Sequence, residues 1–192
     1  VLSRTYIKNL VYKERLNQME EITHQMFRNL EDVIGNRWAD VDVQCNYLIG
    51  TDLQTDTDLY AYLQRVSALS NLEEKQITLL VVDSAGRYYT QQGSRGLLRE
   101  MHYLEDDPEW VNYVTNSLTE SDSRMVFLKR LDTPITLQAG TAQISLRYYG
   151  IAQSMEQLNT YFRCDAYDDH NSVYVLENNG LKLFNSNNTE LL

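Results

Sequence analysis

The sequence is poor in proline and cysteine, with only 2 residues of each in 192. It also contains no run of roughly 20 apolar residues, the length that a membrane-spanning helix needs, and no leader pattern opens it. Hydrophobic residues nevertheless make up 43% of the chain, which is typical of an ordered globular protein and not of a disordered one. We therefore expect a folded region that contains no span of its own.

Basic residues are also few. The chain has 17 Lys and Arg against 27 Asp and Glu, a formal net charge of −10. Proteins that bind nucleic acids or anionic lipid surfaces neutralise phosphates with clustered Lys and Arg, and no such cluster occurs in this sequence. The charge balance predicts no nucleic-acid partner and no direct docking on a membrane surface.

Catalytic and metal-binding motifs are missing as well. The glycine-rich loop 91–96 lacks the GK[ST] ending of a phosphate-binding loop, and no G-x-S-x-G or H-E-x-x-H pattern is present. The three histidines, His24, His102 and His170, are far apart, and the adjacent side chains of residues 168–170 would rarely converge on one cation. We expect no catalytic residue, no metal site and no cofactor.

The two cysteines, Cys45 and Cys164, belong to no CxxC or Cys/His pattern. They can be two separate free thiols, or they can form one long-range disulfide in an oxidising compartment. The sequence leaves both readings open.

The amino-terminal segment predicts one long helix from about Arg4 to Gln44. Apolar residues recur there at mostly three- and four-residue steps, as in Tyr12, Leu16, Met19, Ile22, Met26, Leu30, Val33 and Val41. A helix of this length needs cover for its apolar side. That cover can come from its own domain or from a second copy across a dimer seam. The chain starts at Val1 directly in this periodic segment, so we expect it to be a piece of a longer protein.

Two β-hairpins are predicted by β-branched and aromatic runs around a glycine turn, at residues 77–90 and 173–184. Gly86 and Gly180 occupy the same place in each, so we expect one supersecondary unit to be used twice.

Between the hairpins, Asp107 and Pro108 predict the start of a helix whose apolar face includes Trp110 and Leu118. Another helix is expected from about Asp58. Two strands are expected at 125–131 and 141–152, with a turn at 132–134, and residues 154–157 match a helix capping box. Short turns between strands predict an α+β fold, with an antiparallel sheet and helices on one side.

The stretches LLVVDSAGRYYTQ, ISLRYYGIAQSMEQLNTYF and VYVLENNGLKLF, which follow the long helix, resemble the extracytoplasmic Cache (PAS-like) sensor domains of bacterial receptors. Such domains occur in chemoreceptors, histidine kinases and diguanylate cyclases, and the tandem form hangs two PAS-like modules on one long helix. The resemblance implies a helical stalk at 1–50, a PAS-like module at 51–152, and the start of a second, incomplete module at 153–192. Either the sequence ends inside that second module, or the second module is a truncated remnant that packs on the first sheet.

The resemblance also implies a small-molecule ligand on one face of the sheet, possible pairing of two copies through the long helix, and membrane spans only in flanking segments. Aromatic walls and one cation suit a small carboxylate or amine. The residues expected to contact the ligand are Tyr88, Tyr89, Tyr103, Trp110, Tyr113, Arg147 and Tyr149. Of these, Arg147 stands out because a cation in the middle of a strand needs a partner. The alternative is a ligand-free interaction module whose long helix dimerises or docks a partner protein.

Overall fold

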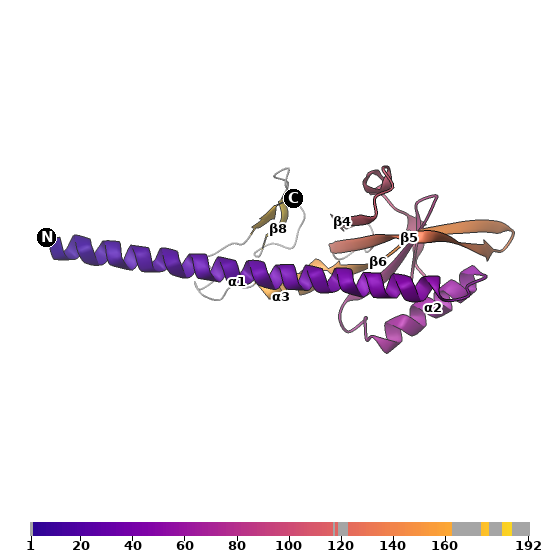
Figure 1. Ribbon diagram of the computed structural model, residues 1–192, viewed down its shortest axis with the longest axis horizontal. Coiled ribbons are helices and arrows are strands. Elements are labelled where there is room, and N and C mark those ends of the chain that lie inside the picture. Colours follow the sequence, from indigo (N-terminus) through magenta and orange to yellow (C-terminus); the bar gives the residue numbers. More distant parts are fainter. Residues whose placement is uncertain (1, 117, 119–122, 163–173, 177–181, 186–192) are drawn as a thin grey trace.

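The computed structural model in Figure 1 describes residues 2–116, 118, 123–162, 174–176 and 182–185. It has the predicted α+β fold, a long amino-terminal helix on an antiparallel sheet. The elements are α1 (Leu2–Ile49), α2 (Asp56–Leu69), β1 (Ile77–Asp83), β2 (Arg87–Thr90), β3 (Arg95–Leu97), the 3₁₀ turn η1 (Met101–Leu104), β4 (Trp110–Thr115), β5 (Arg124–Ala139), β6 (Ala142–Ser154), α3 (Met155–Phe162), β7 (Tyr174–Leu176) and β8 (Lys182–Asn185).

Six strands form one sheet in the order β3-β2-β1-β6-β5-β4, and every neighbouring pair is antiparallel. The predicted first hairpin is confirmed as β1 and β2, with Val82 opposite Tyr88. β1 and β6 lie at the centre, and all seven residues of β1 are buried. A strand buried on both faces reads as a continuous apolar run, which explains the sequence of β1.

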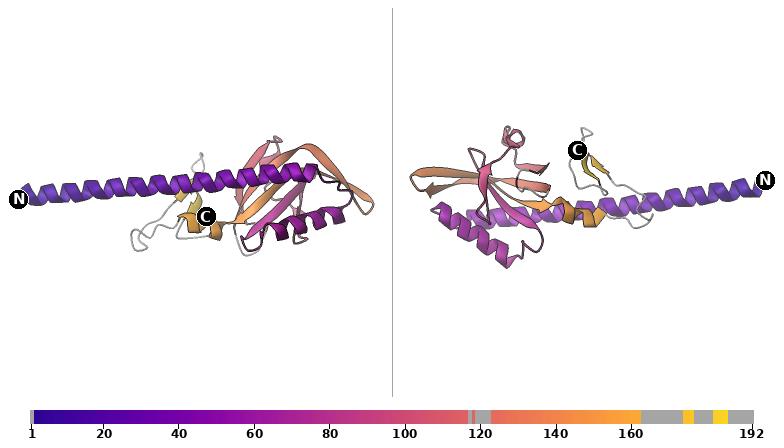
Figure 2. Two further views of the ribbon diagram at one scale, coloured as in Figure 1. Left: turned by 60° about the horizontal axis from the view of Figure 1, so that its bottom comes forward. Right: turned by 180° about the vertical axis from the view of Figure 1, so that it is seen from behind.

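The sheet separates two hydrophobic layers, because different elements cover its two faces (Figures 1 and 2). On the first face α1 and α2 pack over a cluster that includes Leu79, Phe127 and Ile151. On the second face residues 98–104, with η1, cover a cluster that includes Leu80, Val126 and Leu128. The alternation of Leu79 and Leu80 between the clusters is the two-residue period of a strand.

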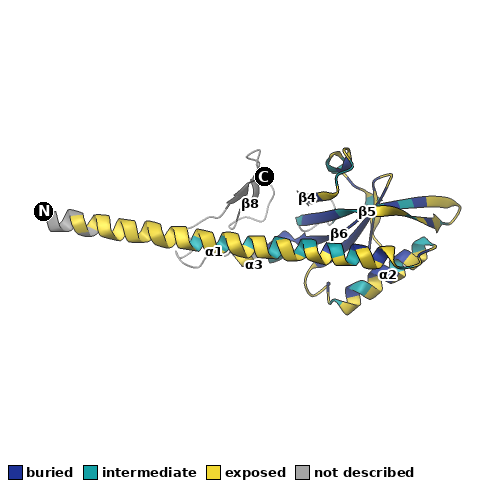
Figure 3. Ribbon diagram, viewed as in Figure 1, coloured by how far each residue is buried: buried dark blue, intermediate teal, exposed yellow. Residues whose placement is uncertain are grey.

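The carboxyl-terminal half of α1 packs on the sheet, and the amino-terminal half extends away from it (Figure 3). Val41, Cys45 and Leu48 are at most 2% exposed, whereas Tyr12 and Met19 are 66% and 53% exposed. Within the described part of the chain, the helix's own domain therefore supplies the cover expected from the sequence for half of the helix length. Burial against this domain also raises the pKa of the Cys45 thiol to about 12. Cys45 is a free thiol, and Cys164 lies outside the described residues.

Polar contacts fix the register of α1 on the sheet. Arg37 donates from Nε to Oε1 of the fully buried Gln153 at 2.6 Å, and the hydroxyl of Tyr149 donates to Gln44 at 2.5 Å. The ammonium of Lys129 pairs with Asp42. Buried polar groups need partners, so these contacts allow only one alignment of the helix with β5 and β6.

Two sequence predictions are wrong around β4 and β5. Residues 110–115 form β4 and not a helix, since they pair with β5 from Trp110 opposite Lys129 to Thr115 opposite Arg124. Alternate burial along β4 places Val111, Tyr113 and Thr115 in the interior. The turn predicted at 132–134 lies inside β5, which continues to Ala139, and the chain reverses at Gly140, whose φ is +61°.

The capping box predicted at 154–157 does not form. Ser154 ends β6, its hydroxyl has no hydrogen-bond partner among the described residues, and Gln157 accepts from Gln153 instead. A capping box does form at α2, where the Thr55 hydroxyl accepts from the Asp58 backbone and the Asp58 carboxylate accepts from the Thr55 backbone.

The second predicted hairpin is confirmed within its described part, where β7 pairs with β8 as a separate two-stranded sheet (Figure 2). Residues 168–170 lie outside the described part of the chain. Among the described helices, none is both long enough and apolar enough to serve as a membrane span.

Gly150 is required by the close contact of β6 with β5. A Cβ added at this position would lie 1.8 Å from the carbonyl oxygen of Phe127. We predict that Gly150→Ala lowers the free energy of unfolding by about 3 kcal/mol, because β5 and β6 would have to separate. Gly35→Ala is the matched control, since nothing lies within 4 Å of its Cβ on α1. It should raise the free energy of unfolding by roughly 0.5–1 kcal/mol through helix propensity. Urea denaturation of both variants checks this, and equal effects would contradict it.

Candidate functional site

The second face of the sheet carries the largest group of the expected ligand residues. Tyr88, Tyr103 and Tyr113 all belong to its cluster. The rings of Tyr103 and Tyr113 stack with centroids 5.0 Å apart and planes 12° apart. Tyr113 is 1% exposed, and its hydroxyl has no hydrogen-bond partner among the described residues. Burial raises the pKa of Tyr113, so this hydroxyl stays protonated and can donate.

The other three expected aromatic residues lie on the first face, so the structure does not bring all seven together. Tyr89 donates its hydroxyl to buried Asp83 at 3.1 Å. Trp110 packs edge-on against Trp38 of α1, with centroids 5.1 Å apart. Tyr149 is fully buried and contacts Gln44 of α1. These three side chains hold the turn of the first hairpin and the helix in place.

A polar cluster is centred on Asp107, which lies between η1 and β4. Arg147 donates from Nε to Oδ1 of Asp107 at 3.1 Å and from Nη2 to Oδ2. Arg130 donates from Nη1 to the same Oδ2 at 2.9 Å, and Tyr148 donates its hydroxyl to Oδ1 at 3.0 Å. One carboxylate thus accepts hydrogen bonds from two guanidinium groups and a phenol. We call Asp107, Arg130, Arg147 and Tyr148 the Asp107 cluster.

An irregularity of the sheet allows two consecutive residues of β6 to reach the same carboxylate. Val82 pairs with Tyr148 but the next residue, Asp83, pairs with Leu146, so Arg147 is the extra residue of a β-bulge. The register of β5 against β6 breaks at the same point, between Arg130 and Ile135. A bulge interrupts the alternation of side chains and can redirect them. Arg147 and Tyr148 therefore both contact Asp107.

The backbone of Asp107 is left-handed, with φ at +50°. This region is uncommon for residues other than glycine, although Asp is among those that tolerate it best. Pro108 follows, and proline favours an extended conformation in the residue before it. The contacts of the Asp107 cluster therefore hold a backbone that local preferences disfavour.

The cluster strongly favours the ionised carboxylate. The hydrogen bond from Arg147, together with those from Tyr148 and Arg130, lowers the pKa of Asp107 to about 2. Burial and the neighbouring carboxylate raise the pKa of Tyr148 to about 12. At neutral pH the cluster thus holds two positive charges, one negative charge and a protonated phenol.

Sequence reasoning singled out Arg147 and the need for a partner, but it missed Asp107, Arg130 and Tyr148. Asp107 was expected to cap a helix, because an Asp-Pro pair is a strong helix-start signal. The available hint was the pair of cations Lys129 and Arg130 that follows the apolar run of β5. The bulge in β6 determines which of these residues contact one another, and no local sequence motif predicts that bulge.

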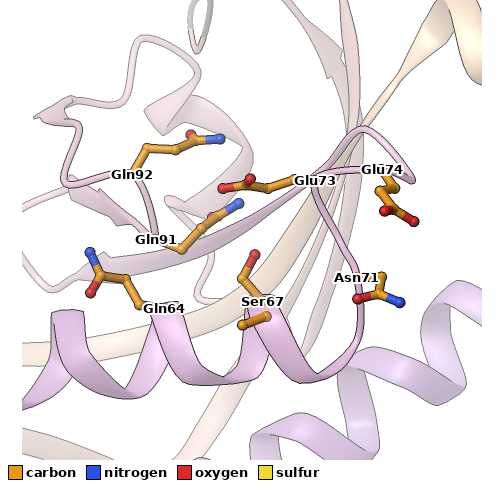
Figure 4. A pocket seen from close by; sticks show the side chains of 8 residues that line it. Gln64, Ser67, Asn71, Glu73, Glu74, Gln91 and Gln92 are labelled. Atoms are coloured by element: carbon orange, nitrogen blue, oxygen red, sulfur yellow. The ribbon is translucent and has the colours of Figure 1, made fainter.

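A separate hollow of about 590 Å³ lies away from this cluster, between α2 and the end of β2 (Figure 4). Amide and carboxylate side chains line it, including Gln64, Asn71, Glu73 and Gln92. Gln91 forms one wall, where its side chain accepts from the Leu79 amide at 2.8 Å and donates to the Ile77 carbonyl at 3.3 Å. Gln91 therefore continues the pairing of β1 beyond the end of β2. No group of three His, Cys, Asp or Glu that could hold a metal occurs among the residues that the structure describes.

The fold is similar to solved structures of chemoreceptor domains. No protein-family model matches the chain, and no curated protein matches it. The sensory domain of the Campylobacter jejuni chemoreceptor Tlp3 (CcmL) with isoleucine bound aligns with a TM-score of 0.62 and 9% identity, over 94% of this chain and 74% of that one. The ligand-binding domain of Tlp3 in complex with L-valine aligns with the same TM-score, 10% identity and the same coverage. At such identity the likeness establishes the fold.

The low pKa of Asp107 predicts a pH-dependent contribution to stability. A carboxyl whose pKa falls from 3.8 to about 2 on folding stabilises the fold fully above the unfolded value. That contribution is lost as the pH falls through the folded value. The difference in free energy of unfolding between wild type and Asp107→Asn should therefore be constant from pH 7 to about 5 and shrink between about pH 4 and 2. Urea denaturation at each pH measures it, with exposed Asp106 as the control in Asp106→Asn. A difference that persists unchanged at pH 2 would contradict the assignment.

Proposed function

We propose that this chain is the extracytoplasmic ligand-sensing input domain of a bacterial transmembrane receptor of the Cache (PAS-like) type. The observation that carries this proposal is the fold, which matches chemoreceptor sensory domains over 94% of the chain. The second face, where a cation pair lies beside aromatic rings, supplies chemistry that fits a small ligand. The output domain, such as a histidine kinase or diguanylate cyclase, would lie elsewhere in the protein.

The proposed ligand is a small carboxylate or amine, with an amino acid as the first candidate. The similar domains are described with isoleucine and L-valine bound. An amino acid carries both charges, and the Asp107 cluster presents guanidinium groups and a carboxylate on the same face. Tyr88, Tyr103 and Tyr113 would supply the apolar walls.

We further propose that three segments of the chain have different roles. Residues 1–50 would form the signalling helix, residues 51–152 the ligand-binding PAS-like module, and residues 153–192 the start of a second module. Arg37, Asp42 and Gln44 of α1 contact β5 and β6, so a ligand that moves these strands could change the position of α1. Catalysis would then belong to the output domain and not to this chain.

The ligand prediction can be tested by isothermal titration with the amino acids and with matched carboxylates and amines. At least one compound should bind the wild type, and Arg147→Ala should weaken its binding at least tenfold, because the variant removes two donors of the cluster. Arg28→Ala is the control, since Arg28 is exposed on α1 and contacts its own helix. Circular dichroism confirms folding. Equal affinity in both variants would remove the cluster from the ligand site.

A second function, dimerisation or docking of a partner protein through α1, is favoured by one observation. Tyr6, Leu10, Tyr12, Leu16 and Met19 are all between 47% and 70% exposed along the free half of the helix. Tyr12, Leu16 and Met19 continue the three- and four-residue spacing of the buried stripe. Such a row of apolar side chains suits a helical seam.

If α1 pairs two copies, the double variant Leu16→Glu with Met19→Glu should shift sedimentation from dimer to monomer at micromolar concentration. Charges placed in an apolar seam would be buried without partners. Asn17→Glu, at an exposed position between them, should leave the dimer intact. A wild type that sediments as a monomer at all concentrations would exclude pairing through α1.

A further inference from the structure

We propose that Arg130, Arg147 and Tyr148 form a carboxylate-binding site that Asp107 occupies from within the chain, so that a ligand carboxylate binds by exchanging with Asp107. This inference rests on the proposed ligand-sensing function and deepens it, since it assigns the ligand group and the residues that bind it. It also makes the described structure the closed, self-occupied state.

The donor set is suited to a carboxylate. Arg147 contacts both oxygens of Asp107 through Nε and Nη2, the side-on bidentate arrangement that a guanidinium makes with a planar carboxylate. Arg130 and Tyr148 each add one donor. Four hydrogen bonds from side chains therefore converge on one group. The carboxylate of Asp107 thus shows that these three residues can together bind a carboxylate group.

The charge within the cluster is not balanced. Among the residues that the structure describes, Asp107 is the only carboxylate within ion-pair distance of Arg130 or Arg147. Two guanidinium charges thus face one carboxylate charge. Both Arg side chains are partly open to solvent, with 36% and 32% of their side-chain surface exposed, and Asp107 has 41% exposed. An outside anion can therefore approach the two cations without unfolding of the buried layers.

The backbone of Asp107 favours its release. Asp107 lies before Pro108 with φ at +50°, and its amide donates to the Leu104 carbonyl at 3.0 Å. Its left-handed conformation is otherwise maintained by the hydrogen bonds that its carboxylate accepts and by Arg130 Nη1, which also donates to its carbonyl at 2.5 Å. Once a ligand takes those donors, Asp107 can relax to the extended conformation that proline prefers in the preceding residue. Strained backbone held by its surroundings is a feature of ligand clamps and switch regions.

Release of Asp107 also explains how a filled face could admit a ligand. Leu98, Met101, Tyr103 and Leu104 pack on the second cluster, so the apolar layer is occupied in this structure. These residues belong to the segment that leads directly into Asp107. Exchange at Asp107 would free the carboxyl-terminal end of that segment and allow Tyr103 to move off Tyr113, whose hydroxyl is buried without a partner in the described part of the chain. The ligand would then gain that donor as well.

The experiment is a titration of the chain with acetate, with acetamide as the neutral probe of the same shape, at constant ionic strength. Asp107→Asn removes the internal competitor, so we expect it to bind acetate at least tenfold more tightly than the wild type does. Binding of acetamide should not change. Asp106→Asn, which alters the neighbouring exposed acid, should behave as the wild type. Adding Arg147→Ala to Asp107→Asn should abolish the gain.

Two results would overturn the inference. One is that Asp107→Asn binds acetate no more tightly than the wild type does. The other is that this variant binds inorganic phosphate more tightly than acetate. If the variant does not fold, the wild type decides the question. The Nε–H signal of Arg147 in ¹H–¹⁵N spectra must shift as acetate replaces chloride, and an unchanged signal would overturn the exchange.

The two proposals can fail separately. A metabolite that binds the wild type without shifting the Arg147 signal, and with the same affinity for Asp107→Asn, would overturn the exchange and leave the sensor function standing. If Asp107→Asn strengthens acetate binding, the exchange is supported even when no compound of the amino-acid screen binds the chain. The failed screen would then count against the sensor function alone.

Discussion

One sheet must be covered on both faces, and the rest of the structure depends on this constraint. β1 and β6 form its centre, and β1 is buried along its whole length while β6 is buried from Tyr148 to Ser154. Neither face can therefore be left to solvent without exposing a large apolar surface. α1 and α2 cover the first face, and the segment before β4 covers the second. The helical cover is extensive and its register is set by polar contacts. The segment on the second face has little regular structure, and Asp107 ties its end to β5 and β6. The two covers thus differ in secondary structure and in the contacts that attach them to the sheet.

The sequence predicted those parts of the fold whose signals are local. The long helix follows from apolar residues such as Leu30, Val33 and Val41 at helical spacing, and the first hairpin follows from a β-branched run before Gly86. A helix was predicted at residues 110–115 because the preceding Asp-Pro pair is a strong helix-start signal. In the structure Val111, Tyr113 and Thr115 face the interior in alternation, as in a strand. Pairing with β5 overrides the local helix signal there.

The candidate site was only partly predictable, and the reason is geometric. Tyr88 and Tyr89 are neighbours in sequence, but consecutive strand residues point to opposite faces, so only Tyr88 belongs to the second cluster. Arg147 was identified as a cation that needs a partner, and Asp107 is that partner. Its identity depends on contacts between residues 40 positions apart in the chain. A spacing rule cannot supply such a contact, because the bulge that aligns Arg147 and Tyr148 is a property of the assembled sheet.

The bulge in β6 also has a structural consequence. Arg147 contacts Asp107 above the sheet, whereas Tyr149, two residues later, contacts Gln44 of α1 below it. In a regular strand residues two apart would lie on the same face, so Arg147 and Tyr149 contact opposite layers because of the bulge. Two peptide bonds, or about 7 Å of backbone, separate these two residues. β6 therefore joins the Asp107 cluster on one layer to the contact with α1 on the other through one short stretch of strand.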